Sequence, residues 1–226
     1  DIRLFLIIEG LYMTLAREVN MSKFINDNCM NVMKKYPDKY FDLAIVDPPY
    51  GGGRHKTRNT GKRNGKWFSN YDEKIDLWDK PPTQEYFDEL FRVSKNQIIW
   101  GGNYFNLPPS RGFVIWKKKS ISEKFSMAMC EYAWMSFDKS AKCFEYKPQG
   151  DKNDPRFHPT QKPIALYEWI LKMYAKDGDV ILDTHVGSGS SLIACENMGF
   201  EYVGCEIDKE YYDKACERIL KFRKEK

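Results

Sequence analysis

The sequence predicts an α/β protein in which a mostly parallel β-sheet carries helices on both faces. Short apolar runs alternate with segments of helical periodicity, and residues 179–207 contain a complete strand, helix and strand unit. The chain has 226 residues, a length that favours one domain with a large core over two separate domains. We therefore expect a single domain over residues 21–226.

Strands and helices are expected where the apolar residues recur with the matching period. Apolar runs bounded by turn residues predict strands at 23–26, 41–46, 97–102, 112–118, 131–137, 143–147, 179–183 and 202–207. Apolar residues every three or four positions predict helices at 29–36, 83–94, 165–174, 190–198 and 209–226. In the helix at 165–174, helical spacing predicts that Leu166, Trp169, Ile170 and Met173 lie in the core.

Residues 1–20 are expected to be an N-terminal extension. Because Met21 reads like a natural start, one interpretation is that the extension is not native. The other is a native helix that packs through Leu4, Ile8, Leu11 and Leu15.

The positive charges are concentrated in one predicted loop, at about residues 51–79. The net charge of +4 is only mildly basic and does not by itself indicate a nucleic-acid partner. Within this loop, however, no acidic residue occurs before Asp72, and the cations that precede it are Arg54, Lys56, Arg58, Lys62, Arg63 and Lys66. We expect these side chains to contact phosphate groups, and any of the three arginines to be able to contact guanine edges instead.

Several classes of protein are disfavoured by composition. No apolar stretch approaches the roughly 18 residues of a membrane span, and a signal peptide fits poorly because only Arg3 would supply its basic region. The six cysteines form no CxxC pair, and the three histidines show no metal-ligand spacing with them. We expect a cytoplasmic protein with reduced thiols, no metal site and no membrane contact.

The segment "ILDTHVGSGSSLIA" predicts a nucleoside cofactor site. Gly187 and Gly189 stand between an apolar strand and a helix, where glycine lets a ligand approach the backbone closely. Glu206 ends the next strand, about 20 residues later, where a carboxylate can bind ribose hydroxyls. Leu192 stands where a dinucleotide fingerprint needs its third glycine, so S-adenosylmethionine fits better than a nicotinamide cofactor.

The segment "AIVDPPYGGG" predicts a site for a planar amine. Asp47 follows a strand, so it is expected at the carboxyl edge of the sheet, where ligands of open α/β folds bind. Pro48 and Pro49 make a rigid extended corner that lacks N–H donors. A carboxylate and a carbonyl held there can accept both hydrogens of an exocyclic amine, while Tyr50 offers a ring for stacking. Such a base must be flipped out of a duplex.

These motifs together resemble the β-class amino-group DNA methyltransferases. "DPPY" comes first, followed by "HPTQKP", "DTHVGSGS" and "GCEID", which is the circularly permuted motif order of that class. The resemblance implies a Rossmann-like S-adenosylmethionine-dependent methyltransferase fold. An aspartate at position 47 looks like the N6-adenine branch.

The resemblance also implies roles for individual residues. The target adenine would be bound and activated by Asp47, Pro48, Pro49 and Tyr50. The cofactor would be lined by Asn28, Cys29, Asp183, His185, Gly187, Ser188, Gly189, Ser190 and Glu206. Thr160 and Lys162 would lie near its methionine carboxylate.

Two positions depart from the family pattern. Asn28 stands where the family often has aspartate, so cofactor contacts there are expected to differ in detail. Thr184 and His185 replace a usual Pro-Phe pair, and His185 is either a flat ring over the methionine portion or a turn histidine. Trp100 is expected either in the core or against the base.

The leading hypothesis is a DNA adenine-N6 methyltransferase acting on double-stranded DNA. N4-cytosine methylation is the first alternative, and a catalytically inactive DNA-binding subunit is the second. RNA or a protein glutamine as substrate is disfavoured, as is a nicotinamide dehydrogenase. A homodimer that shares DNA recognition and a cognate restriction endonuclease are the expected protein partners.

Overall fold

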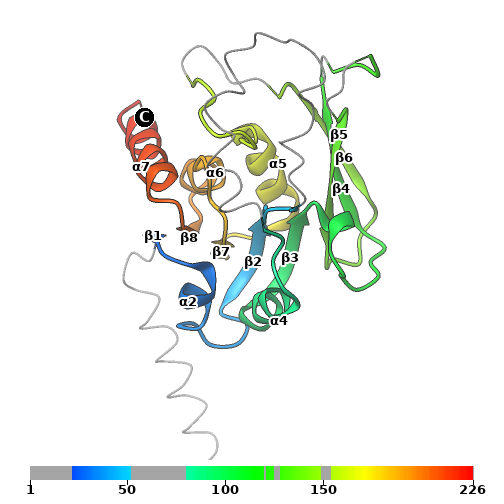
Figure 1. Cartoon of the computed structure of the whole chain (residues 1–226), viewed down its shortest axis with the longest axis horizontal. Helices are drawn as coiled ribbons and strands as arrows, with labels where there is room; N and C mark the ends of the chain where they lie inside the picture. Colours follow the sequence, from blue (N-terminus) through cyan, green and yellow to red (C-terminus); the bar gives the residue numbers. More distant parts are fainter. Residues whose placement is uncertain (1–21, 52–79, 120, 125–127, 149–153, 226) are drawn as a thin grey trace, which may run out of the picture.

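An eight-stranded sheet organises the molecule, with strand order β1-β8-β7-β2-β3-β5-β4-β6 and helices on both faces (Figure 1). The computed structural model describes residues 22–51, 80–119, 121–124, 128–148 and 154–225. The α/β class with a mostly parallel sheet, predicted from the alternating pattern, is confirmed. The extension at residues 1–20 and most of the basic loop lie outside the described residues, so the domain limits stay a prediction.

The observed elements lie close to the predicted ones. The strands are β1 Lys23–Asn26, β2 Phe41–Val46, β3 Ser94–Trp100, β4 Phe113–Lys118, β5 Cys130–Met135, β6 Lys142–Tyr146, β7 Val180–Asp183 and β8 Glu201–Glu206. The helices are α2 Cys29–Met33, α4 Gln84–Val93, the 3₁₀ turn η1 Gly102–Tyr104, α5 Ile164–Tyr174, α6 Ser190–Met198 and α7 Lys209–Lys224. The helix α2 ends three residues earlier than predicted, ahead of Pro37, and β3 begins three residues earlier.

Five strands run parallel and end at one edge of the sheet. β1 pairs with β8, β8 with β7, β7 with β2, and β2 with β3, all in parallel register. Asp47, Asp183 and Glu206 stand at the carboxyl ends of β2, β7 and β8. The parallel arrangement therefore gathers the three acidic residues selected from the sequence along one edge.

The strand β5 is antiparallel to both of its neighbours, β3 and β4. Trp100 at the end of β3 lies opposite Ala133, so the beginning of β5 meets the end of β3. Glu131 stands near the start of β5. Because β5 is reversed, its start lies at the edge where β3 ends, so Glu131 comes to the same edge as Asp47. An antiparallel edge on a parallel sheet is common in α/β folds.

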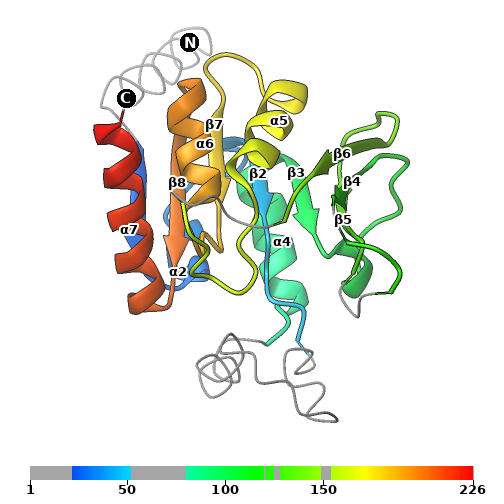
Figure 2. The same ribbon diagram turned by 90° about the horizontal axis from the view of Figure 1, so that it is seen from above.

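Apolar side chains pack on both faces of the sheet. One core cluster joins residues of α5, α6 and α7 to β2, β3 and β7, and the other joins α2 and α4 to the opposite face. The helices α7, α6 and α5 lie in that order over the first face (Figure 2). Trp100 is fully buried in the first cluster, which confirms the core interpretation of this ring.

The buried face of the helix α5 differs in part from the predicted one. Leu166 and Ile170 are buried as expected, but Met173 is 38% exposed, so its assignment to the core was wrong. The buried face also includes Tyr167, Leu171 and Tyr174, because the apolar stripe is wider than the four selected residues.

Two further observations bear on the class of protein. Among the described helices, none has the length and apolar composition needed to cross a bilayer. All six cysteines are free thiols, at positions that range from buried to exposed.

We predict that Ile170→Ala lowers the free energy of unfolding by about 2–5 kcal/mol, because it removes packed methylene groups from a fully buried position. The matched control in the same helix is Met173→Ala, which should change it by less than about 0.5 kcal/mol. Urea denaturation followed by circular dichroism measures both. Equal losses would contradict the observed face of α5.

Candidate active site

The segment after β2 places a carboxylate between two donors. The Tyr50 hydroxyl donates to Asp47 Oδ1 at 2.7 Å, and the Lys162 ammonium donates to Asp47 Oδ2. Pro48 is buried, whereas Asp47, Pro49 and Tyr50 are partly exposed. Because each proline fixes its own φ and lacks an N–H, this corner is rigid and rich in acceptors.

The ring of Tyr50 occupies space that Gly101 leaves free. Gly101 adopts a φ of +66°, and a Cβ at this position would lie 2.1 Å from Tyr50 Cε1. Tyr104 stacks on the Tyr50 ring, with centroids 4.8 Å apart and an interplanar angle of 27°. Burial, with the nearby Asp47 charge, raises the pKa of Tyr50 well above its usual value, so its hydroxyl stays protonated. Stacking of Tyr50 on a base stays a prediction, and within the protein its ring stacks on that of Tyr104.

A chain of alternating charges extends from Asp47. Lys162 Nζ lies 3.2 Å from Glu131 Oε2, and Lys118 Nζ lies 2.6 Å from Glu131 Oε1. The Lys162 side chain is only 2% exposed, and its ammonium lies 5.1 Å from the centroid of the Trp100 ring.

Both central groups of this chain are charged. Burial alone would lower the pKa of Lys162, but Asp47 and Glu131 outweigh it and raise the pKa. Burial likewise opposes ionisation of Glu131, yet Lys162 and Lys118 lower its pKa to about 2. Lys162 and Glu131 therefore remain ionised across the physiological range.

The glycine loop after β7 contacts the carboxylate at the end of β8. Gly187 and Gly189 have φ angles of +55° and +82°, which favour glycine. The Gly187 N–H donates to Glu206 Oε2 at 2.8 Å, and the Asp208 N–H donates to Oε1 at 2.9 Å. Each oxygen of Glu206 keeps a second lone pair that can accept a hydroxyl of a ligand. Burial raises the pKa of Glu206.

Asp183 and His185 are turned into the protein around the start of the same loop. Asp183 accepts hydrogen bonds from the Ser191 hydroxyl and from the His185 N–H. Burial raises the pKa of Asp183 to about 7 and lowers that of His185 to about 4. His185 Nδ1 lies 2.9 Å from Thr184 Oγ1, and its ring meets Tyr86 edge-on at 5.4 Å. This neutral, packed ring is suited to contact rather than to proton transfer.

The segment "HPTQKP" reaches both halves of the site. His158 packs against Gly187, where a Cβ would lie 3.2 Å from the imidazole, and Thr160 Oγ1 lies 3.2 Å from His158 Nδ1. Two residues later, Lys162 contacts Asp47. The segment thus links the glycine loop to the corner at Asp47, with Thr160 on the loop side and Lys162 on the corner side.

Asn28 and Cys29 follow β1, whose last residue, Asn26, pairs with Glu206 at the end of β8. The Asn28 side chain accepts the Met30 N–H at 2.8 Å and so caps α2. Burial raises the pKa of Cys29 to about 11, which keeps its thiol protonated.

The hydroxyls of Ser188 and Ser190 face inward and lie 3.2 Å apart. Arg218 of α7 donates to the Ser188 carbonyl at 2.8 Å and to Ser190 Oγ at 2.9 Å. The same guanidinium pairs with both oxygens of Asp154, at 2.7 and 2.6 Å. Arg218 and Asp154 were not selected from the sequence, where they read as ordinary surface charges.

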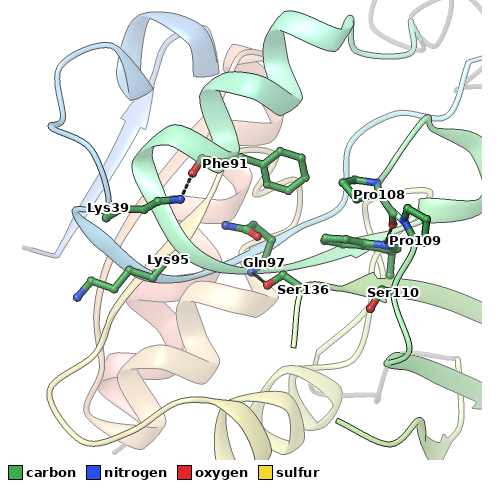
Figure 3. A pocket seen from close by; sticks show the side chains of 9 residues that line it. Lys39, Phe91, Lys95, Gln97, Pro108, Pro109, Ser110 and Ser136 are labelled. Atoms are coloured by element: carbon green, nitrogen blue, oxygen red, sulfur yellow. Dashed lines mark hydrogen bonds between the residues drawn. The ribbon is translucent and has the colours of Figure 1, made fainter. Parts of the chain in front are cut away.

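The basic residues Arg54, Lys56, Arg58, Lys62, Arg63 and Lys66 lie outside the described residues. A hollow of about 360 Å³ lies at the opposite end of β3 (Figure 3). Its two cations already have partners, since Lys39 donates to the carbonyls of Phe91 and Ser94 and Lys95 pairs with Asp42.

Comparison with known proteins decides the family. A family model described as DNA methylase, of the N6/N4 methyltransferase group, matches residues 99–217, which is more than half of the chain. The chain belongs to this DNA methylase family. It is a DNA methyltransferase of the amino-group class, as the resemblance of its motifs indicated.

Relatives of this methylase include the Escherichia coli (strain K12) protein YubD, named as a methylase, which is 25% identical over 88% of this chain and 90% of its own length. Among solved structures, the M1.HpyAVI complex with S-adenosylmethionine matches with a TM-score of 0.59 and 19% identity, covering 88% of this chain and 99% of that one. The PvuII cytosine-N4-specific DNA methyltransferase matches with a TM-score of 0.61 and 12% identity, covering 90% and 92%. At these identities the solved structures show a shared fold.

We predict that Asp183→Asn changes how the stability of the methylase depends on pH. The pKa of Asp183 is raised from 3.8 to about 7 in the folded state, so folding retains a proton that the unfolded chain loses. This contribution is fully present below pH 4 and is lost as the pH rises towards 7, by about 1.4 kcal/mol for each pH unit between the two pKa values.

Because His185 titrates in the opposite sense, the quantity to measure is the difference in unfolding free energy between wild type and Asp183→Asn. This difference should favour wild type more strongly at pH 4.5 than at pH 7.5. A difference independent of pH would show that Asp183 is ionised in the folded protein.

Proposed function

We propose that this methylase transfers the methyl group of S-adenosylmethionine to the exocyclic N6 amine of an adenine flipped out of double-stranded DNA. The observation that carries the proposal is the contact of one segment, "HPTQKP", with both the glycine loop and Asp47. A site for a nucleoside cofactor and a site for an amine are thereby held together.

Asp47 and the Pro48 carbonyl are the proposed acceptors for the two amine hydrogens. An aromatic amine is a poor nucleophile because its lone pair is delocalised into the ring. Two acceptors that pull the N–H groups out of the ring plane favour a tetrahedral nitrogen whose lone pair points away from them. The nitrogen forms a bond to the methyl carbon while the bond from that carbon to sulfur breaks, and the electron pair of the broken bond stays on the sulfur. The methylated nitrogen is acidic and releases one proton to solvent, so a strong general base is not required.

The glycine loop and its surroundings fit S-adenosylmethionine, which supplies a methyl group on a positively charged sulfur. Glu206 is the proposed ribose ligand, since its two oxygens each have one backbone donor and a remaining lone pair. The left-handed backbone at Gly187 and Gly189 gives this loop its tight turn, against which His158 and Ile219 pack. Asn28, Cys29, Asp183, His185, Ser188, Ser190 and Thr160 complete the proposed lining.

Lys162 is better assigned to the amine side than to the methionine carboxylate. Its buried ammonium already contacts two carboxylates, Asp47 and Glu131, and a third would compete with them. In this assignment Lys162 orients Asp47 by donating to Oδ2, while Oδ1 accepts the Tyr50 hydroxyl.

The choice of adenine rests on Asp47 at the first position of "DPPY". N4-cytosine transfer is the second candidate, and the likeness to the cytosine-N4-specific PvuII enzyme favours keeping it. Liquid chromatography and mass spectrometry of nucleosides, from DNA treated with the enzyme and labelled cofactor, separate the two. N6-methyladenine supports the proposal, and N4-methylcytosine alone would replace it.

An inactive DNA-binding subunit is the alternative from another class. The intact corner at Asp47 and the complete contacts of Glu206 favour an active enzyme. DNA binding without incorporation of label, in a sample that binds S-adenosylmethionine, would favour the inactive subunit. Contacts of the basic residues 54–66 with DNA, a homodimer and a paired restriction endonuclease remain predictions.

We predict that Asp47→Ala lowers the rate of methyl transfer by at least about 10²-fold, because the amine loses a charged acceptor. The dissociation constant of S-adenosylmethionine should stay within about 3-fold of wild type. Single-turnover assays and calorimetry measure the two effects. The matched control is Asp138→Ala, an exposed aspartate whose loss should leave both values unchanged. Equal loss of transfer and cofactor binding would instead indicate a folding defect or a cofactor role.

For Glu206→Ala we predict that the main effect is on cofactor binding. Loss of a charged acceptor for ribose hydroxyls should weaken cofactor binding by about 10- to 100-fold. The matched control is Glu201→Ala at the other end of β8, which should have no effect on binding. An unaltered dissociation constant for Glu206→Ala would exclude the ribose assignment.

A further inference from the structure

Three neighbouring strands carry the residues that surround the Lys162 ammonium beside the proposed amine site. Asp47 follows β2, Trp100 ends β3, and Glu131 lies near the start of β5, which is next to β3 in the sheet. The Lys162 ammonium lies over Trp100 on the middle strand and contacts the carboxylates on the two outer strands. Neighbouring strands are about 4.8 Å apart, so one ammonium can span this arrangement.

We infer that Glu131 is a positioning residue for methyl transfer, which offsets the charge of Lys162 so that Asp47 presents a net negative charge to the target amine. The inference rests on the proposed function. Glu131 lies behind Lys162 and is not expected to touch the base. It therefore acts on the reaction through Lys162 and Asp47.

The amine nitrogen becomes positive as it takes the methyl group, so the site must favour a cation at that point. Asp47 and Lys162 alone cancel each other, whereas Asp47, Lys162 and Glu131 together carry one net negative charge. The charge that balances it, on Lys118, lies on the far side of Glu131 from Lys162 and Asp47. Because the Lys162 side chain is 2% exposed and that of Asp47 13%, water screens this balance only weakly.

Lys118 keeps Glu131 in place from the outer side. Its side chain is 10% exposed, and it contacts the Glu131 oxygen that Lys162 does not. Glu131 thus has a partner for each oxygen, which fixes the carboxylate and the position of Lys162. A purely structural role, in which Glu131 only fastens β5 to the core, is the competing account.

The first test compares Glu131→Gln with Glu145→Gln. Both remove one carboxylate charge from a pair with a lysine of β4, but the Lys117–Glu145 pair is exposed and distant from Asp47. We expect Glu131→Gln to lower kcat by about 10- to 100-fold, while the KM for DNA and the cofactor dissociation constant change by less than about 3-fold. Glu131→Asp, which keeps the charge, should recover part of the loss, and Glu145→Gln should match wild type.

The second test repeats Glu131→Gln in a Lys162→Met background. Without the ammonium, Glu131 has no positive charge to offset, so removing its own charge should not lower kcat further than Lys162→Met alone does. A structural role predicts a further loss of about the size seen in the wild-type background. Such a further loss, or a wild-type kcat for Glu131→Gln, would overturn the inference. Thermal unfolding checks that every variant is folded.

Failure of the proposed function gives a different result. If wild-type protein transfers no methyl group to DNA, the proposed function fails before any variant is compared. If wild type is active and Glu131→Gln equals it, only the role of Glu131 is excluded.

Discussion

The ion pair between Lys162 and Asp47 is the interaction on which the arrangement of the site depends. A carboxylate at the end of β2 and an ammonium 115 residues later are held together in a nearly dry environment. Burying either charge alone would be very unfavourable, so the pair forms only when the sheet edge, the corner "DPPY" and the segment "HPTQKP" are all in place. The fold and the site therefore specify each other.

The glycines of this region have the same structural role, because each lets a side chain from a distant part of the sequence approach its backbone closely. Gly101 leaves room for the Tyr50 ring, and Gly187 leaves room for His158. Both contacts join parts of the chain that are far apart in sequence, and both lie beside atoms proposed to touch a ligand. Their small size is thus part of the geometry of the site as well as of the backbone.

Most of the fold could be predicted from the sequence, because apolar periodicity is local. The runs at 23–26 and 41–46 match β1 and β2 residue for residue, and Asp47, Asp183 and Glu206 fall on one edge as expected. Glu131 could not be found this way, since its position depends on the reversed direction of β5, which no local pattern records. Arg218 was missed for the same reason, because its partners are 30 and 64 residues away.

The long reach of Arg218 has a consequence for how the molecule is assembled. The loop at 187–190 is fastened by a guanidinium from α7, the C-terminal helix of the described residues. During synthesis on the ribosome the loop emerges well before that arginine does. The loop at 187–190 is therefore expected to reach its final shape only after α7 has left the exit tunnel and docked, at a late stage of folding.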